Sequence, residues 1–192
     1  MQVTPYNTDQ SKKTQVEDMF DNIAPKYDLL NHVLSMKIDV LWRNNLVKWM
    51  RKDHPKLVLD VATGTGDLAI AVQKGLEAEV VGLDLSQQML NVGIDKIKKI
   101  NLSDKITMVK GDAENLTFED NKFDAVSVAF GVRNFENLEK GLAELRRVVK
   151  ENGSVFILEF SKVEGFLGPF YMFYFKNILP QIGKLVSKDN RA

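Results

Sequence analysis

The sequence contains no cysteine, only two histidines and no net charge, and each absence excludes a class of function. Without cysteine there is no disulfide, no thiolate metal site and no cysteine nucleophile, and the composition fits a reducing compartment. His32 and His54 cannot form a zinc cluster by themselves, so we expect no metal. The 26 basic and 26 acidic residues cancel, so no global field attracts nucleic acid, and we expect no nucleic-acid partner.

Long hydrophobic runs are also absent from the sequence. The N-terminus is polar and lacks the apolar segment of a secretory signal. Residues 166–186 are interrupted by glycine, proline and lysine, and a membrane span needs about 18 or more apolar residues in a row. With 192 residues and 44% hydrophobic content, the chain has the length of one domain and enough apolar material for a sizeable core.

The spacing of apolar residues changes near residue 55. Residues 14–50 show helical spacing, and Pro25 separates the first two helical segments. Five short apolar runs follow, at residues 56–62, 78–84, 106–112, 123–130 and 153–160. Their nearly continuous hydrophobicity predicts strands that are covered on both faces. Helical stretches lie between them, at residues 67–75, 86–100 and 137–150. This alternation predicts an α/β fold with a doubly wound, mainly parallel sheet and a helical N-terminal extension.

The segment LDVATGTGD, residues 59–67, ends the first predicted strand and combines two glycines with two carboxylates. In a doubly wound sheet, ligands bind beyond the carboxyl ends of the strands, where glycine lets the backbone approach the ligand. Gly64 begins a GxGxxA pattern, and Asp84 follows 20 residues later, where a carboxylate would hold ribose hydroxyls. A tight turn, with Asp84 capping a helix, is the alternative explanation.

The two carboxylates of this segment distinguish between ligand classes. Asp67 is expected at a helix N-terminus, where it would repel the pyrophosphate of a dinucleotide. Asp60, at the end of the first strand, adds a second negative charge, and both would favour a cation. A nucleoside with a positive charge and no phosphate describes S-adenosylmethionine. The alternative for Asp67 is a carboxylate that only stabilises its own helix.

The ends of the third and fourth predicted strands place further polar residues at the same edge. In KGDAENL, Asp112 could accept a hydrogen bond from the adenine amine, while the small Ala113 leaves room for the ring. In AFGVRN, Arg133 lies on the side that would face a second substrate. A surface turn and an ion-paired or capping arginine are the respective alternatives.

With these four strand ends in place, the chain resembles the class I S-adenosylmethionine-dependent methyltransferases. More narrowly, it resembles the menaquinone and ubiquinone biosynthesis C-methyltransferase family. The matching segments are VEDMFDNIAPKYDLLNHVLSMKIDVLWR, LDVATGTGDLA, LDLSQQML, GDAENLTFEDNKFDAVSVAFGVRN and LEFSK. They span nearly the whole chain, and the IAPKYDLLN and FGVRN portions are more specific than the glycine loop.

The resemblance implies a Rossmann-like class I methyltransferase fold with S-adenosylmethionine as cofactor. The cofactor positions of the family fall on Thr65, Asp84, Asp112 and Ala113. The residue pattern adds Asp60 and Gly64 to this predicted set. A serine that contacts the cofactor in the family corresponds to Ala129, and the first glycine of the wider methyltransferase loop corresponds to Ala62. Both contacts therefore differ in this chain.

By the same resemblance, the methyl acceptor is a ring carbon of a reduced, polyprenylated quinol that becomes nucleophilic when a phenolic proton leaves. The implied reaction is C-methylation of demethylmenaquinol to menaquinol. Arg133 is predicted to stabilise the phenolate and Asp67 to accept the proton through water, with Tyr27 and His32 as further candidates. The alternatives are the equivalent benzoquinol methylation of the ubiquinone pathway, an NAD-dependent oxidoreductase, and an inactive, truncated binding module.

Residues 1–52 are expected to cap the substrate site, and residues 53–192 to form the domain that binds S-adenosylmethionine. Because the family continues with another helix and an antiparallel strand pair, we expect the last strands to be missing and the activity to be low. The fifth strand would then form an uncovered edge, which predicts homo-oligomers. The aromatic segment 166–175 predicts a lid or transient contact with a membrane surface. We therefore expect a cytoplasmic protein, peripheral on the inner face of the membrane.

Overall fold

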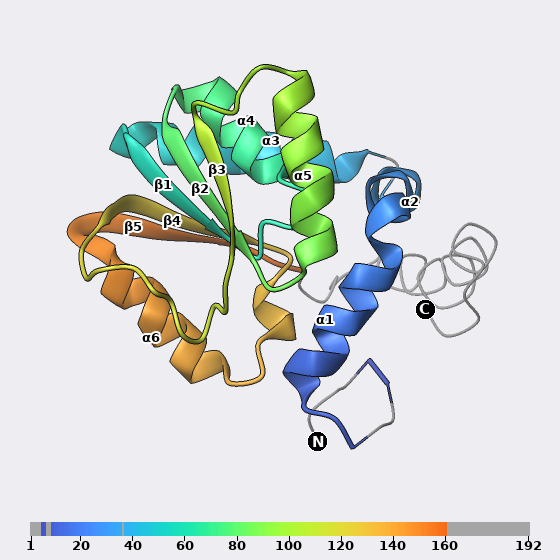
Figure 1. Cartoon of the computed structure of the whole chain (residues 1–192). Helices are drawn as coiled ribbons and strands as arrows, with labels where there is room; N and C mark the ends of the chain where they lie inside the picture. Colours follow the sequence, from blue (N-terminus) through green and yellow to red (C-terminus); the bar gives the residue numbers. More distant parts are fainter. Residues whose placement is uncertain (1–4, 7–8, 36, 161–192) are drawn as a thin grey trace, which may run out of the picture.

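The centre of the molecule is a five-stranded parallel sheet (Figure 1), seen in a computed structural model that describes residues 5–6, 9–35 and 37–160. The strands are β1 (Leu57–Val61), β2 (Glu79–Asp84), β3 (Ile106–Lys110), β4 (Phe123–Ala129) and β5 (Val149–Leu158). They are arranged in the order β3-β2-β1-β4-β5. From β1 the chain continues to β2 and β3 on one side of the sheet, whereas β4 and β5 lie on the other side of β1. The order of the strands therefore reverses at β1, and a crevice forms at such a switch point. The predicted doubly wound α/β fold is confirmed.

Helices cover both faces of this sheet. They are α1 (Lys12–Ile23), α2 (Tyr27–Leu34), α3 (Ile38–Met50), α4 (Asp67–Leu76), α5 (Gln87–Lys99) and α6 (Leu138–Val148), with short 3-10 turns at Ala24–Lys26, Arg51–Asp53 and Val132–Asn134. Figure 1 shows α3, α4 and α5 on one face and α6 on the other, while α1 and α2 lie beside the carboxyl ends of the strands. The N-terminal extension therefore lies at the edge where ligands bind in this fold class.

The strands are apolar at successive positions because both faces are buried. Val58 packs with α3 and α4 on one face, and its neighbour Leu59 packs with α6 on the other. Both side chains are fully buried. Since side chains alternate between the faces of a strand, each face receives its own core. The continuous hydrophobicity in the sequence thus reflects two packed layers of helices.

The sequence predicted the start of α5 and the turn before α2 correctly, but it did not predict the end of α6. Ser86 caps α5 as predicted, with its hydroxyl accepting a hydrogen bond from the Met89 backbone N–H. Pro25 lies in the turn between α1 and α2, as predicted. The prediction of a helix through residue 150 was wrong, because α6 ends at Val148 and Val149 already pairs with Phe123 of β4. Val149 is buried in the sheet core, so strand pairing replaces the apparent continuation of the helix.

In the described part of the chain, β5 is an edge strand that pairs with β4 alone. Ile157 and Phe160, at the end of this strand and just beyond it, are nearly half exposed. The predicted edge position of the fifth strand is thus confirmed for the residues described. The aromatic segment 166–175 lies outside them. None of the described helices is long and apolar enough to cross a membrane.

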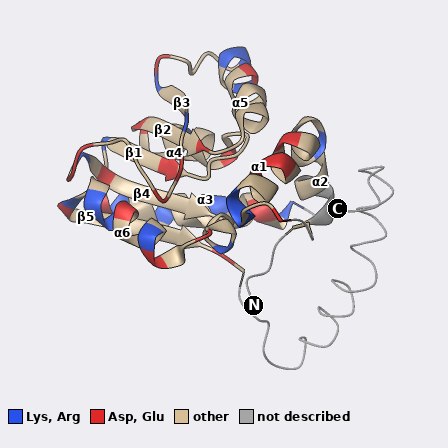
Figure 2. Cartoon of the chain, turned by 60° about the horizontal axis from the view of Figure 1, so that its bottom comes forward, with Lys and Arg blue, Asp and Glu red and all other residues tan. Residues whose placement is uncertain are grey.

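Charged side chains of both signs are interspersed over the helices around the sheet, as Figure 2 shows for α3, α5 and α6. The last turn of α6 contains Arg147, which pairs with Glu144 on the same helix and with Asp120 in the loop between β3 and β4. Such exposed pairs contribute little to stability, about 0–1 kcal/mol each. The fold therefore depends mainly on its two apolar cores.

The substitution Gly141→Ala tests the packing of α6 against the loop after β4. A Cβ atom at Gly141 would lie 2.3 Å from Cδ2 of the buried Phe135 ring. Helix propensity alone predicts that Gly141→Ala raises the free energy of unfolding by about 1 kcal/mol, whereas overpacking against Phe135 lowers it by about 1–3 kcal/mol. We expect a net loss of about 1 kcal/mol in the free energy of unfolding, measured by urea denaturation. The control is Ala143→Gly, at an exposed position of α6, which measures the effect of helix propensity alone. If Gly141→Ala were more stable than the parent, the close contact between Gly141 and Phe135 would be contradicted.

Candidate functional site

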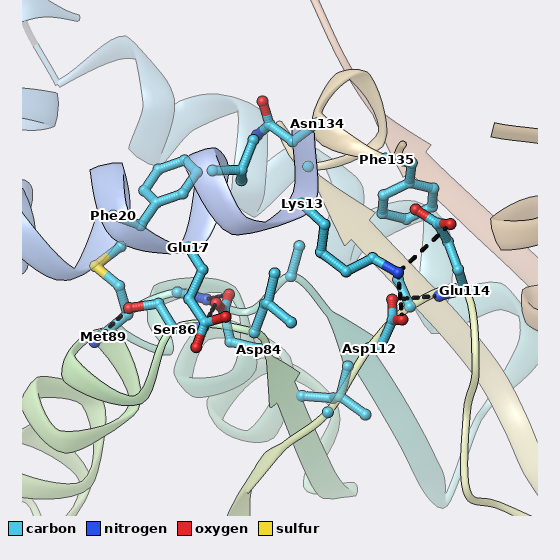
Figure 3. Close-up of a pocket in the computed structure, with 18 of the residues that line it drawn as sticks. Lys13, Glu17, Phe20, Asp84, Ser86, Met89, Asp112, Glu114, Asn134 and Phe135 are labelled. Atoms are coloured by element: carbon cyan, nitrogen blue, oxygen red, sulfur yellow. Dashed lines mark hydrogen bonds and ion pairs between the residues drawn. The ribbon is translucent and has the colours of Figure 1, made fainter. Parts of the chain in front are cut away.

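A pocket opens at the carboxyl edge of the sheet, directly below α1 (Figure 3). Its empty volume is about 720 Å³, a figure that includes the solvent-filled space at its open mouth. Loops after β1, β2, β3 and β4 contribute to its lining, with Ala62, Gly64, Asp84, Ser86, Asp112, Ala113, Ala129 and Gly131 among the residues. The N-terminal helices contribute Lys13, Val16, Glu17, Phe20 and Tyr27. Four strand ends and the helical extension therefore meet at one site.

The glycine loop follows β1 and turns sharply into α4. Gly64 has a φ of +57° and Gly66 a φ of +78°, a left-handed conformation in which a side chain would be strained. The Gly64 backbone N–H donates to Oδ2 of Asp84 at 2.8 Å, and the Ser86 N–H donates to Oδ1 at 2.9 Å. Burial raises the pKa of Asp84, and these backbone donors oppose that shift. The Asp84 carboxylate thus lies in the pocket wall with its orientation fixed by two loops.

Asp112 and Ala113 also line the pocket, on the loop after β3. Oδ1 of Asp112 accepts from the Glu114 backbone N–H at 2.9 Å, and Oδ2 accepts from Lys13 Nζ at 2.7 Å. Glu114 is itself buried and accepts from the backbone N–H of Glu136 at 2.7 Å. Because β2 and β3 are paired, the structure brings the residues predicted from their ends to neighbouring parts of one cavity.

Asp60 lies below the glycine loop and outside the pocket lining. Its side chain is completely buried, and it accepts from the Thr63 hydroxyl at 2.7 Å and the Ser127 hydroxyl at 2.8 Å. Burial raises its pKa to about 6, although both hydroxyls favour the charged form. The sequence predicts Asp60 as a cofactor-binding residue, whereas the structure places its side chain outside the pocket lining. Asp60 instead supports the loop through Thr63.

Thr65 and Asp67 also lie outside the pocket lining, within a network of charged side chains behind the loop. The Thr65 hydroxyl donates to Asp28 at 2.5 Å, and Asp67 pairs with Lys96 at 2.5 Å and with Arg43 at 3.2 Å. Asp39 completes the network through its ion pair with Arg43. We call these five charged residues the α4 network: Asp28, Asp39, Arg43, Asp67 and Lys96. Because two cations neutralise Asp67, its geometry matches the helix-stabilising alternative rather than a base at the substrate.

Arg133 lies in the turn after β4, outside the pocket lining and about half exposed. Its guanidinium donates to Glu159 at 2.5 Å and lies 5.4 Å from the centre of the Phe160 ring. This is the ion-paired alternative of the sequence prediction. Tyr27 does line the pocket, and burial raises the pKa of its phenol, so it remains protonated at neutral pH. His32 belongs to α2, but its side chain lies outside the described residues.

The sequence predicted that residues 1–52 cap the substrate site, but it did not identify which residues of α1 line the pocket. Lys13 is 99 residues from Asp112 in the chain, and Lys12 donates to the backbone carbonyl oxygens of Arg133 and Phe135 at 2.9 and 2.7 Å. The helical spacing of residues 14–50 indicated a helix but not the loops that it would contact. The polar residues at the start of α1 carried no motif that could have revealed these contacts.

Comparison of the sequence with known proteins identifies the family of this chain. The model of the ubiE/COQ5 methyltransferase family matches residues 8–192. The chain belongs to this family. The resemblance of the sequence to quinone-pathway C-methyltransferases is thereby confirmed.

Individual members of the ubiE/COQ5 family match along most of their length. Demethylmenaquinone methyltransferase of Bacteroides fragilis is 48% identical over 192 residues, which cover 99% of this chain and 78% of that protein. The ubiquinone/menaquinone biosynthesis C-methyltransferase UbiE of Geobacter sulfurreducens is 44% identical, with 92% of this chain and 70% of that protein covered. The protein is therefore a methyltransferase of this family.

Solved structures agree on the fold. The cyclase SpnF matches with a TM-score of 0.68 over 80% of this chain and 62% of its own length, at 24% identity, which supports the fold alone. A SAM-dependent methyltransferase from Aquifex aeolicus matches with a TM-score of 0.53 at 28% identity, over 57% of this chain and 59% of that one. The class I methyltransferase architecture is thus confirmed.

The buried carboxyl of Asp60 predicts a measurable pH dependence of stability. Its pKa is about 6 in the folded protein and close to 3.8 in the unfolded chain, so folding favours the protonated form. The stabilising contribution is complete below about pH 3.8 and is lost as the pH rises through about 6. Asp60→Asn removes this titration. From pH 4.5 to 7.5, we expect the stability of the parent to fall by about 2 kcal/mol relative to the variant.

Urea denaturation of both proteins across this pH range provides the measurement. Glu79→Gln, at an exposed position of β2, serves as the matched control because it removes one acid outside the core. A constant difference in stability between the parent and Asp60→Asn would show that Asp60 does not titrate as the structure requires.

Proposed function

We propose that this protein transfers the methyl group of S-adenosylmethionine to a quinol ring carbon, converting demethylmenaquinol to menaquinol. The observation that carries the proposal is the 48% identity, over 99% of the chain, to a protein named demethylmenaquinone methyltransferase. Other relatives carry names that include the ubiquinone pathway, and the equivalent benzoquinol reaction is the second candidate. A polyprenylated quinol is therefore the proposed acceptor.

The charges of the pocket support S-adenosylmethionine over a dinucleotide. Carboxylates of Glu17, Asp84, Asp112, Glu114 and Glu136 line it, together with a single lysine, Lys13. Such a lining attracts a sulfonium and repels a pyrophosphate. The N-terminus of α4, where a dinucleotide phosphate would bind, already contains Asp67. We propose that Asp84 holds the ribose hydroxyls, that Asp112 and Ala113 receive the adenine, and that Gly64 approaches the cofactor through its backbone.

The remaining predicted site residues are proposed to act indirectly. Asp60 positions the glycine loop through Thr63, to which its carboxylate is hydrogen-bonded. Thr65 and Asp67 fix the start of α4 through their contacts with Asp28, Lys96 and Arg43. These contacts hold the loop rigid below the ligand. We no longer propose Asp67 as the proton acceptor, because two cations already pair with its carboxylate.

When bound, the cofactor would supply an activated methyl group. The protein would position the acceptor and stabilise the phenolate that forms when the phenolic proton passes to solvent water. Holding the two reactants in line contributes about 7–11 kcal/mol to lowering the barrier. We propose that Arg133, which lies outside the pocket lining next to the lining residues Gly131 and Asn134, exchanges its ion pair with Glu159 for the phenolate when the acceptor binds. The phenol of Tyr27, protonated at neutral pH, can donate a hydrogen bond inside the pocket.

The N-terminal helices are proposed to cap the acceptor site and to contact the membrane that contains the prenyl tail. Residues 1–52 include α1 and α2 beside the pocket mouth, and Leu29, Leu41 and Trp49 on α2 and α3 each expose more than half of their surface. Exposed apolar residues of this kind support transient contact with a membrane surface. We propose a cytoplasmic protein at the inner face of the membrane that can self-associate through β5.

A methyl-transfer assay tests the function directly. The purified chain is incubated with radiolabelled S-adenosylmethionine and reduced demethylmenaquinone in detergent, and the menaquinol product is identified by mass spectrometry. A benzoquinol precursor in parallel distinguishes the two candidate substrates. Calorimetric titration with S-adenosylmethionine and with NAD separates a methyltransferase from an oxidoreductase, and binding of NAD alone would overturn the proposal.

Substitution of Asp84 by Asn tests the ribose contact. The amide oxygen can accept from only one of the two backbone donors, Gly64 and Ser86, and the amide NH2 must face the other. The negative charge is also lost, so a charge-assisted hydrogen bond to the ribose is replaced by a weaker one. We expect binding of S-adenosylmethionine to weaken by about tenfold, since hydrogen bonds to charged groups contribute about 1.5–3 kcal/mol. Asp95→Asn, on the exposed side of α5, is the matched control. Unchanged affinity in a folded Asp84→Asn protein would contradict the assignment.

Replacing Arg133 by Lys tests the acceptor side. Lysine retains the charge but loses the planar donor fork, so stabilisation of the phenolate should weaken. We expect kcat to fall by at least about tenfold while the affinity for S-adenosylmethionine stays at the parent value. Arg146→Lys, an exposed position of α6, should change neither quantity. If the affinity falls and kcat is retained, Arg133 belongs to the cofactor site.

A further inference from the structure

Lys13 reaches from the first turn of α1 into the pocket, where it contacts two carboxylates. Its ammonium lies 2.7 Å from Oδ2 of Asp112 and 3.8 Å from an oxygen of Glu114, and Figure 3 shows both contacts. The hydrogen bond to Asp112 raises the pKa of Lys13, so the side chain remains charged at neutral pH. A lysine in the first turn of a helix is unfavourable for the helix dipole, so α1 itself gains nothing from this charge.

The two oxygens of Asp112 have different partners. Oδ1 is held by the backbone N–H of Glu114, two residues along the same loop. Oδ2 is the oxygen that Lys13 contacts across the pocket. If Asp112 receives the adenine, as proposed above, the exocyclic amine must donate to an oxygen of this carboxylate. The oxygen that is free of backbone donors is the one to which Lys13 is already bound.

We propose that the Lys13 ammonium competes with the adenine amine for Oδ2 of Asp112 and thereby sets both the affinity and the base preference of the cofactor site. This proposal rests on the proposed function, because it takes Asp112 as the adenine acceptor. A ligand amine that takes the lone pair used by Lys13 displaces the ammonium, and one that takes the second lone pair of Oδ2 shares the oxygen with it and forms a weaker hydrogen bond. A ligand with a carbonyl oxygen at the same ring position would instead accept from Lys13 and be repelled by Asp112. Lys13 therefore lowers the preference of the pocket for adenine over its 6-oxo counterpart.

The competition is weak enough to be overcome by the cofactor. Lys13 and Asp112 retain 31% and 28% of their side-chain exposure, so water screens the pair. Partly exposed ion pairs of this type change an equilibrium by about two- to fivefold. Displacing Lys13 also leaves α1 in place, because Lys12, Glu17 and Asp21 hold the helix to the loop after β4, the last residue of β3 and the loop after β2.

The test uses two neutral ligands that differ at one ring position. S-adenosylhomocysteine has the amine, S-inosylhomocysteine has a carbonyl, and neither has the sulfonium charge, so a change in charge attraction does not obscure the result. Dissociation constants are measured by calorimetry for the parent and for Lys13→Met, which keeps an unbranched side chain and removes the ammonium. We expect binding of the adenosyl ligand to tighten by about two- to fivefold and binding of the inosyl ligand to weaken. If the inosyl ligand weakens by the same two- to fivefold, the ratio of the inosyl to the adenosyl dissociation constant should rise by about four- to twenty-five-fold.

Two further variants exclude indirect explanations. Lys13→Arg keeps a donor at the same place and should restore a ratio near the parent value. Lys110→Met removes the ion pair between Lys110 and Glu17, which also fastens α1 but has its lysine outside the pocket lining. This control should leave the ratio unchanged. An equal rise in Lys110→Met would assign the effect to loosening of α1 and would overturn the role of Lys13.

The outcomes also separate this inference from the proposed function. If the parent binds S-adenosylhomocysteine and the ratio is the same in Lys13→Met, the competition at Asp112 is disproved while the cofactor site stands. If neither the parent nor Lys13→Met binds the adenosyl ligand, the proposed cofactor site itself is wrong, and the role of Lys13 is lost with it. Circular dichroism of each variant confirms that α1 and the sheet remain folded.

Discussion

The hydrogen bond from the Gly64 backbone N–H to the Asp84 carboxylate determines the shape of the pocket. It joins the loop after β1 to the end of β2, and the same carboxylate is held from the other side by the Ser86 N–H at the start of α5. Because both donors are backbone groups, the carboxylate is fixed without depending on a mobile side chain. The remaining pocket residues are arranged around this fixed point, with Asp112 on one side and Ala62 on the other.

The sequence was sufficient to predict the sheet and the residues at its ligand-binding edge. Strand pairing follows from near-continuous apolar runs, and the carboxyl ends of parallel strands must share an edge, so Gly64, Asp84, Asp112 and Ala113 were placed correctly in one pocket. The end of α6 was misplaced because Val148 and Val149 continue the apolar helical spacing, whereas the decision between helix and strand comes from the pairing with β4.

The direction in which a side chain leaves the loop could not be predicted in the same way. Asp60 and Asp67 lie at the correct edge, but Asp60 points below the loop toward Ser127, and Asp67 points toward Lys96. These orientations depend on Arg43 and Lys96, which come from α3 and α5 and share no local pattern with the loop. Likewise, Lys13 reaches Asp112 only because α1 crosses the strand ends.

The α4 network has a consequence for how sequences of this family can diverge. Its three acids and two bases come from α2, α3, α4 and α5, and Arg43 and Asp39 are almost fully buried. Losing one partner of a buried ion pair costs about 3–5 kcal/mol, whereas replacing the whole group by apolar residues is often close to neutral. A change from the buried ion pair to an apolar group is therefore expected to involve substitution of both partners. Related sequences should either retain Asp39 and Arg43 together or have exchanged both, whereas the partly exposed Asp28, Asp67 and Lys96 can change at smaller cost.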